Sequence, residues 1–258
     1  MRNAITTTVA SLTLLALAGC KSGTMPGDPT VGTTTTGGGG GTDDGGTIPA
    51  VWSKVSGVTI YSDGDYVVVE STGIPNHKSP YFSTSDSRYE ADTDPGFHQN
   101  PSLIASQNLV FRIPKTPTAA ASKSATPMGP IGVSINGVPF FNQYAAGGSP
   151  LGSGEISSFD QYNGHPQSSG MYHYHVEPLY LTSTDGKDAL LGFLLDGYPV
   201  YGPMENGVAV AESDLDAYHG HTSATADYPS GIYHYHVTSV DPYINGSGFY
   251  GVPGTVSQ

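Results

Sequence analysis

The chain has 258 residues, enough for one sizeable hydrophobic core, with 35 glycines and 20 prolines but only 12% charged side chains. This composition gives many turns and few surface helices, so we expect a mainly β fold with few short helices. The net charge of −13 argues against nucleic acid as a partner, because phosphate binding needs clustered lysine and arginine. It is compatible with attracting cations, or with solubility alone.

The N-terminus begins with a short apolar segment that predicts export. Residues 4–19 are rich in leucine, alanine and threonine and are too few for a permanent spanning helix. Small residues then precede Cys20, the only cysteine. The arrangement resembles the lipobox of bacterial lipoproteins, which implies removal of a signal peptide over 1–19 and a lipid on Cys20. An ordinary secretory signal is the alternative.

The residues after Cys20 indicate an anchor and a tether. Lys21 stands where an aspartate would favour inner-membrane retention, so we expect a lipid-anchored protein of the bacterial cell envelope, with the outer membrane favoured over the inner. Residues 20–49 are rich in glycine and threonine and nearly free of apolar side chains. Such a segment forms a flexible linker, and the folded domain is expected over 50–258.

Four strands are expected in the first part of this domain. Alternating or continuous apolar residues predict strands over Val55–Ile60, Tyr66–Glu70, Asn108–Ile113 and Ile131–Ile135. The polar residues Ser62–Asp65 predict the turn between the first two.

The second half of the chain repeats itself. Three blocks recur in the same order: Asn136–Pro139 with Asp196–Pro199, Phe159–His165 with Leu215–His221, and Ser169–Val176 with Ser230–Val237. The last pair is identical at seven of eight positions. We therefore expect two copies of one unit, at about 131–181 and 190–245, packed with pseudo-twofold symmetry into one domain.

Each copy contains two histidines separated by one tyrosine. His173 and His175 belong to one copy, and His234 and His236 to the other. The surrounding aromatic and β-branched residues favour a strand, on which side chains alternate between faces. The two histidines of a pair then share a face about 6.6 Å apart at Cα, and their rings can tilt toward one metal ion.

A third histidine precedes each pair. His165 and His221 occupy matched positions, directly after Gly164 and Gly220, which we expect to give the loop freedom to turn back. The sequence therefore predicts two ligand sets, His165 with His173 and His175, and His221 with His234 and His236.

Other polar residues are candidates for supporting roles. Asp160 and Asp216 match each other and could cap turns, orient ligands or act as bases. Glu177 follows the first histidine pair and is a further candidate base, while His219 could support the second set. No catalytic residue is assigned. A structural ladder of tyrosines and histidines, or metal-free acid–base chemistry, are the alternatives to metal binding.

The metal is expected to be copper or zinc. Imidazole suits both, and no thiolate other than that of Cys20 is available. Copper stands higher in the affinity series, so we place it slightly before zinc.

The paired Tyr-His-Tyr-His blocks resemble the YHYH-domain family of bacterial and other secreted proteins. Further blocks of the family match at Gly73–His77, Gly129–Val133, Asn136–Pro139 and Asp196–Gly202, so the resemblance covers about 55–250. It draws attention to His77, while a role for His77 or His98 stays open. Ala217 and Ser247 stand where other members carry cysteines, so any disulfide there is absent. The resemblance implies no established activity.

Three functions are compatible with these patterns. The first is a cell-envelope lipoprotein that binds copper or zinc through the paired histidine strands. The second is a metal-dependent extracytoplasmic hydrolase or oxidoreductase with an open three-histidine site. The third is a surface module that binds glycans or proteins through exposed tyrosines, with the histidines as a structural ladder.

Overall fold

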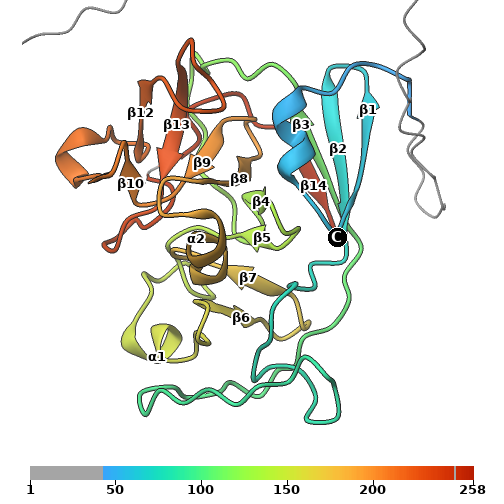
Figure 1. Ribbon diagram of the computed structural model, residues 1–258, viewed down its shortest axis with the longest axis vertical. Helices are drawn as coiled ribbons and strands as arrows, with labels where there is room; N and C mark the ends of the chain where they lie inside the picture. Colours follow the sequence, from blue (N-terminus) through green and yellow to red (C-terminus); the bar gives the residue numbers. More distant parts are fainter. Residues whose placement is uncertain (1–42, 247) are drawn as a thin grey trace, which may run out of the picture. The chain divides into compact units, whose positions relative to one another are not determined.

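The computed structural model describes residues 43–246 and 248–258 (Figure 1). The predicted signal peptide over 1–19, Cys20 and most of the glycine-rich segment lie outside the described residues. Strands occupy more of the chain than helices do, which confirms the predicted mainly β fold. None of the helices in the described part is long and apolar enough to cross a membrane.

One sheet contains four antiparallel strands in the order β1-β2-β3-β14. They are β1 (Thr59–Asp63), β2 (Tyr66–Ser71), β3 (Leu109–Pro114) and β14 (Thr255–Ser257). On β3, Leu109, Phe111 and Ile113 are buried while the residues between them are partly exposed. This alternation turns one face of the sheet toward the core.

The prediction of a strand over Val55–Ile60 is wrong at its start. The segment before it forms a 3-10 helix, η1 (Ala50–Lys54), and the strand begins only at Thr59. The Trp52 ring stacks on the Phe193 ring, with centroids 4.0 Å apart. Val55, which follows η1, is buried in the same core cluster, and this explains why the apolar pattern extends beyond the strand. The turn after β1 consists of Gly64 and Asp65 alone.

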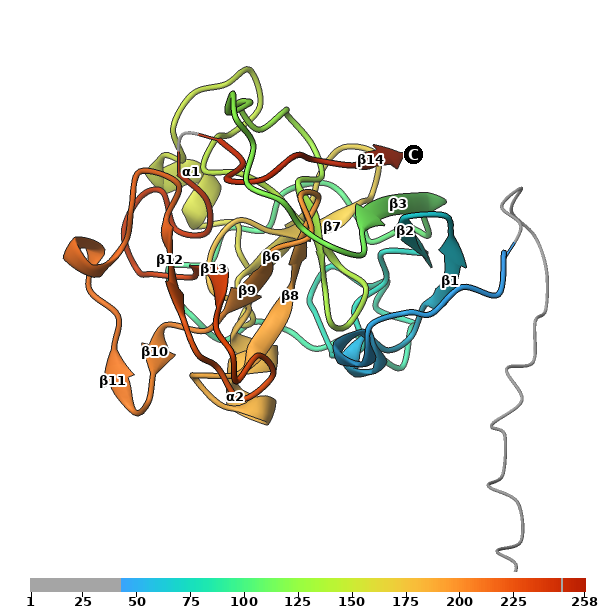
Figure 2. The same cartoon turned by 90° about the horizontal axis from the view of Figure 1, so that it is seen from above.

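A second sheet contains eight strands in the order β12-β13-β9-β8-β4-β5-β7-β6. The strands of its first half are β4 (Gly132–Ser134), β5 (Pro139–Phe140), β6 (Gly164–Pro166) and β7 (Tyr172–Tyr174). Those of its second half are β8 (Leu190–Leu194), β9 (Pro199–Tyr201), β12 (Gly220–Ser223) and β13 (Ile232–His236). The two sheets lie side by side (Figures 1 and 2).

The two halves of the large sheet are paired in the same way. In each half the first strand pairs antiparallel with the second, and the third antiparallel with the fourth. The second and fourth strands of each half run parallel. The halves meet where β4 and β8 pair antiparallel. These pairings agree with the matched sequence blocks, and a rotation axis that relates the two copies stays a prediction.

The remaining elements are short. They are α1 (Ser153–Ile156), α2 (Leu179–Asp185), the 3-10 helix η2 (Glu212–Asp214) and the hairpin of β10 (Met204–Glu205) and β11 (Val208–Ala209). The hairpin and η2 lie between β9 and β12, in a part of the chain that the sequence blocks do not match.

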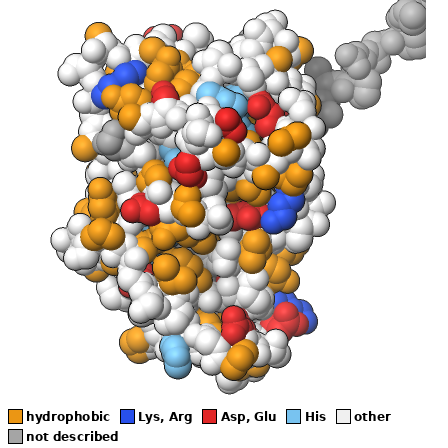
Figure 3. Space-filling model, turned by 90° about the vertical axis from the view of Figure 1, so that its left-hand side faces the viewer, with side chains coloured by type: hydrophobic (Ala, Val, Ile, Leu, Met, Phe, Trp, Pro, Cys, Tyr) orange, Lys and Arg blue, Asp and Glu red, His pale blue; other side chains and the backbone are white. Residues whose placement is uncertain are grey.

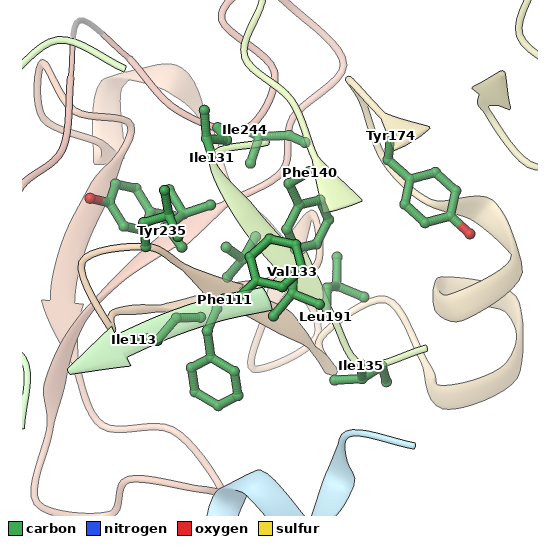
Figure 4. Close-up of a cluster of buried hydrophobic side chains, with 14 of the residues drawn as sticks. Phe111, Ile113, Ile131, Val133, Ile135, Phe140, Tyr174, Leu191, Tyr235 and Ile244 are labelled. Atoms are coloured by element: carbon green, nitrogen blue, oxygen red, sulfur yellow. The ribbon is translucent and has the colours of Figure 1, made fainter. Parts of the chain in front are cut away.

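The hydrophobic core lies where β3 meets the central strands of the large sheet. Phe111 and Ile113 of β3 pack in one cluster with Val133 of β4, Phe140 of β5 and Leu191 of β8 (Figure 4). All of these side chains are fully buried. The strands that hold the histidines, β6, β7, β12 and β13, are the outermost four of the sheet. Each histidine pair is therefore supported by the core on one side and lies near a sheet edge on the other.

Candidate metal centres

The strand register brings the three histidines of each copy together. His165 of β6 lies directly opposite His173 of β7, and His221 of β12 directly opposite His234 of β13. His175 and His236 follow two residues after His173 and His234, so they emerge on the same face of their strands. The histidines form two separate groups, one per copy.

The N-terminal histidine cluster consists of His165, His173 and His175. The Nε2 atom of His173 lies 3.1 Å from Nε2 of His165 and 2.9 Å from Nε2 of His175. The three side chains are 2–3% exposed. Three imidazole nitrogens therefore converge on one point in the interior.

The C-terminal histidine cluster consists of His221, His234, His236 and the carboxylate of Glu205. The Nε2 atom of His221 lies 3.2 Å from Nε2 of both His234 and His236. An oxygen of Glu205 lies 3.5 Å from Nε2 of His221, and the other lies 3.7 Å from Nε2 of His234. The group could hold a metal ion with one more ligand than the N-terminal cluster.

Backbone carbonyls determine which nitrogen carries the proton in the two histidines of each YHYH block. The Nδ1 atoms of His173 and His175 lie 3.0 and 2.6 Å from the carbonyl oxygens of Met171 and Asn142. A carbonyl can only accept, so Nδ1 must be the donor and Nε2 carries a lone pair. In the other copy, Nδ1 of His234 and of His236 is bound in the same way by the carbonyl oxygens of Ile232 and Gly202.

The Nε2 atoms of His173 and His175, and those of His234 and His236, are therefore acceptors without protons. Neutral imidazole with Nδ1 protonated is the form that binds metal through Nε2. Burial lowers the pKa of His165 to about 3 and that of His175 and His236 to about 4, and it holds the pKa of His173 well below 6.5. These rings are therefore neutral at pH 7. Lone pairs at about 3 Å repel one another, and a cation between them removes that repulsion.

One comparison with known proteins found a match. The family model described as YHYH protein matches residues 110–207 and 204–248, more than half of the chain. The chain belongs to the YHYH family. No curated protein and no solved structure matches the chain.

The two tyrosines of each YHYH block anchor the strand from its opposite face. The hydroxyl of Tyr172 lies 2.9 Å from both oxygens of Asp160, and that of Tyr233 lies 2.9 Å from an oxygen of Asp216. In addition, Tyr235 donates to Asp196 at 2.6 Å. The alternation of the YHYH block thus assigns histidines to the cluster and tyrosines to buried anchors.

Asp160 and Asp216 also bind the loop before the third histidine. Asp160 accepts from the backbone N–H groups of Tyr162 and Gly164, and Asp216 accepts from those of Tyr218 and Gly220. Neither carboxylate belongs to a histidine cluster. They occupy turn-capping positions rather than positions next to the converging nitrogens.

The glycine before each third histidine has a different role from the predicted one. A Cβ on Gly164 would collide with the ring and hydroxyl of Tyr172, and one on Gly220 would collide with the carbonyl oxygen of His234. Glycine is therefore required for close approach of the YHYH strand rather than for freedom of the loop. The positive φ angles occur one residue earlier, at Asn163 (64°) and His219 (69°).

The other histidines lie away from the clusters. His77 donates from Nδ1 to the carbonyl of Lys78, and its Nε2 lies 3.0 Å from the hydroxyl of Tyr174. His219 is buried, and its Nε2 lies 3.1 Å from the hydroxyl of Thr238. His98 is exposed. The candidate base Glu177 forms an ion pair with Lys187 at 2.7 Å and does not join the N-terminal cluster.

Two glutamates near the clusters were not identified from the sequence. Glu205 lies on β10, and Glu155 of α1 lies 3.5 Å from Nε2 of His165. Both belong to segments outside the matched blocks, so the repeat gave no signal for them. The two glutamates share only one sequence feature. Each is an acidic residue in the segment that joins the second strand of its copy to the third.

Proposed function

We propose that this YHYH protein binds transition metal ions, one at each histidine cluster, with copper slightly preferred over zinc. The observation that supports this most is the convergence of Nε2 atoms in each cluster, two of which are unprotonated because carbonyl oxygens hold Nδ1 protonated. A structural ladder would place donors opposite acceptors, and these rings present acceptor to acceptor.

The spacing of the nitrogens fits a metal ion. A tetrahedral metal ion with metal–nitrogen bonds of about 2.0–2.1 Å separates its ligand nitrogens by about 3.3 Å, and a square-planar one separates neighbouring nitrogens by about 2.9 Å. The measured separations of 2.9 to 3.2 Å need to expand by only a few tenths of an ångström. Side-chain rotations of this size need no movement of the strands.

The surface-module function has less support. None of the 17 tyrosines is among the exposed residues, and those of the YHYH blocks are buried against carboxylates or the core. An aromatic platform for glycans needs exposed rings. The tyrosines of the YHYH blocks therefore act as internal anchors.

Metal analysis tests the proposal. The purified full-length chain is loaded with equimolar copper and zinc, freed of loosely bound ions and analysed for both elements. We expect one ion per histidine cluster, with copper in excess, and the loss of bound metal in the double variant His173→Ala/His234→Ala. The variant His77→Ala/His98→Ala is the matched control, because it removes two histidines outside the clusters. A folded wild-type chain that retains no metal would contradict the proposal.

We further propose that the metal-binding domain is held at the cell envelope by a lipid on Cys20. The lipobox-like sequence before this residue and the glycine-rich segment after it support the proposal. In a bacterial host, the wild-type chain should fractionate with membranes, the outer membrane above all, and Cys20→Ala should move it to the soluble exported fraction. Equal partition of both forms would contradict lipid anchoring.

A further inference from the structure

The surroundings of the N-terminal histidine cluster are closed and aromatic. The Phe141 ring stacks on His173 with centroids 3.9 Å apart. Phe159 packs edge-on against His165 at 4.8 Å and stacks on His175 at 5.8 Å. Ser158 holds Nδ1 of His165 at 2.7 Å, so all three rings are fixed through their second nitrogen. Apart from Glu155 beside His165, the cluster meets mainly apolar side chains.

The C-terminal cluster has a polar and more open environment. Tyr201 takes the place of Phe141, and its hydroxyl is bonded to Thr225 and Asp227 at 2.8 and 3.1 Å. The side chain of His221 is 23% exposed, compared with 4% for that of His165, its counterpart. Figure 3 shows histidine side chains at the surface beside acidic ones on the face that it draws.

A small cavity adjoins the C-terminal cluster. Its volume is about 100 Å³, and its lining includes His234, His236, Tyr201, Thr225, Ala226 and the two acidic residues Glu205 and Asp188. A water molecule occupies about 30 Å³ of liquid, so the cavity has room for about three heavy atoms. By contrast, the cavity of about 730 Å³ beside Phe159 is lined by none of the three histidines of the N-terminal cluster.

We infer that the C-terminal cluster is an open metal centre that binds a small anion of about three heavy atoms in this cavity, while the N-terminal cluster is closed to such ligands. The inference rests on the proposed metal binding. A divalent ion bound by three neutral imidazoles and one carboxylate keeps a net positive charge, which attracts an anion. The hydroxyl of Tyr201 donates to Asp227 and is bonded to Thr225, so the metal ion is the group that holds the anion.

Azide is the probe, because it is a linear anion of three atoms and its binding to copper(II) is visible by absorption. The full-length chain is loaded with copper(II) and titrated with azide. We use His173→Ala to leave only the C-terminal cluster intact and His234→Ala to leave only the N-terminal one. We expect a saturable azide-to-copper charge-transfer band in His173→Ala and none in His234→Ala.

The outcomes separate the inference from the function on which it rests. Copper in both single variants, with an equal azide response or with none in His173→Ala, would overturn the inference and leave metal binding intact. Absence of copper from both variants and from the wild type would overturn metal binding itself, and the inference with it.

A second variant tests the cavity directly. Ala226→Phe should fill the cavity without removing a metal ligand, so copper content should be unchanged and azide affinity should fall at least about tenfold. Ala209→Phe is the control, since it adds the same ring at an exposed position outside the cavity lining. Unchanged azide affinity in Ala226→Phe would overturn the assignment of the ligand to this cavity.

Discussion

The N-terminal and C-terminal histidine clusters share a strand framework but differ in the side chains that pack around the histidine rings. The register of the paired strands, the carbonyls that bind Nδ1 and the tyrosine anchors correspond in both copies. The differences arise partly at matched positions, where Phe141 and Phe159 of one copy correspond to Tyr201 and Leu215 of the other. They arise partly in the joining segments, which supply Glu205 and part of the cavity lining at the C-terminal cluster. The ligand geometry is thus common to the two copies, and access to it depends on substitutions at matched positions together with the joining segments.

The largest expected difference between the copies is the loss of stability when the carboxylate that binds the anchoring tyrosine is removed. Asp160 is buried and accepts from Ser79, Tyr172 and two backbone N–H groups, whereas Asp216 is exposed. Asp160→Ala leaves these donors without a partner, so it should lower the free energy of unfolding by about 3–5 kcal/mol. Asp216→Ala should cost about 1 kcal/mol, because water replaces the carboxylate.

Urea unfolding of the metal-free variants measures both losses. Equal losses in the two variants would show that the copies are anchored equally, contrary to the burial of only one carboxylate.

Acid should destabilise the metal-free protein. Burial lowers the pKa of His77, His175 and His236 to about 4, so the folded chain binds fewer protons than the unfolded chain between pH 6.5 and 4. The stability that these groups contribute is present above pH 6.5 and is lost as the pH falls through 4. Asp160 and Asp196 act in the opposite direction, since burial raises their pKa to about 6, but the buried histidines outnumber them.

The free energy of unfolding of the metal-free chain should therefore decrease from pH 7 to pH 4.5, as measured by urea denaturation in the presence of a chelator. A constant or rising stability over this range would contradict the neutral, buried state of the rings.

The rate of metal release should distinguish the closed cluster from the open one. With a chelator in excess, copper should leave His173→Ala, in which only the C-terminal cluster remains, at least about tenfold faster than it leaves His234→Ala. The reason is that release from the closed cluster requires local opening around Phe141 and Phe159. Stopped-flow absorption of the chelator complex gives both rates, and faster release from the N-terminal cluster would reverse the comparison.

The smallest expected effect is the change in metal affinity when either of the two glutamates near the clusters is replaced. Glu205→Gln should weaken metal binding at the C-terminal cluster by a factor of a few, because the carboxylate lies beside two of its histidines. Glu155→Gln should have less effect, since Glu155 lies within 4 Å of only one histidine of its cluster, His165. Zinc competition titrations on the single-cluster variants compare the two, and an equal or larger effect of Glu155→Gln would contradict this ranking.

The sequence predicts the clusters better than their surroundings. Alternation along a strand places His173 and His175 on one face, and the repeat indicates that His165 and His221 have the same role. Glu205 could not be predicted because its hairpin has no counterpart in the first copy. The consequence of Phe141 against Tyr201 depends on ring packing, which a linear pattern does not encode.

For the fold too, the sequence predicts some features well and others poorly. Regular alternation predicts β2 and β3 almost to the residue, whereas the start of β1 was misplaced because apolar residues near η1 pack on the core without forming a strand. The close approach at Gly164 and Gly220 also depends on tertiary packing, since the colliding atoms come from the neighbouring strand.

X-ray absorption spectroscopy on the zinc-loaded His234→Ala variant tests the central claim most directly, because this variant retains only the N-terminal cluster. The account predicts three imidazole nitrogens at about 2.0–2.1 Å from zinc, with the outer-shell scattering of imidazole rings. Adding His173→Ala should abolish that signal. A zinc ion bound mainly by oxygen ligands, and unaffected by His173→Ala, would contradict the assignment of the YHYH histidines as metal ligands.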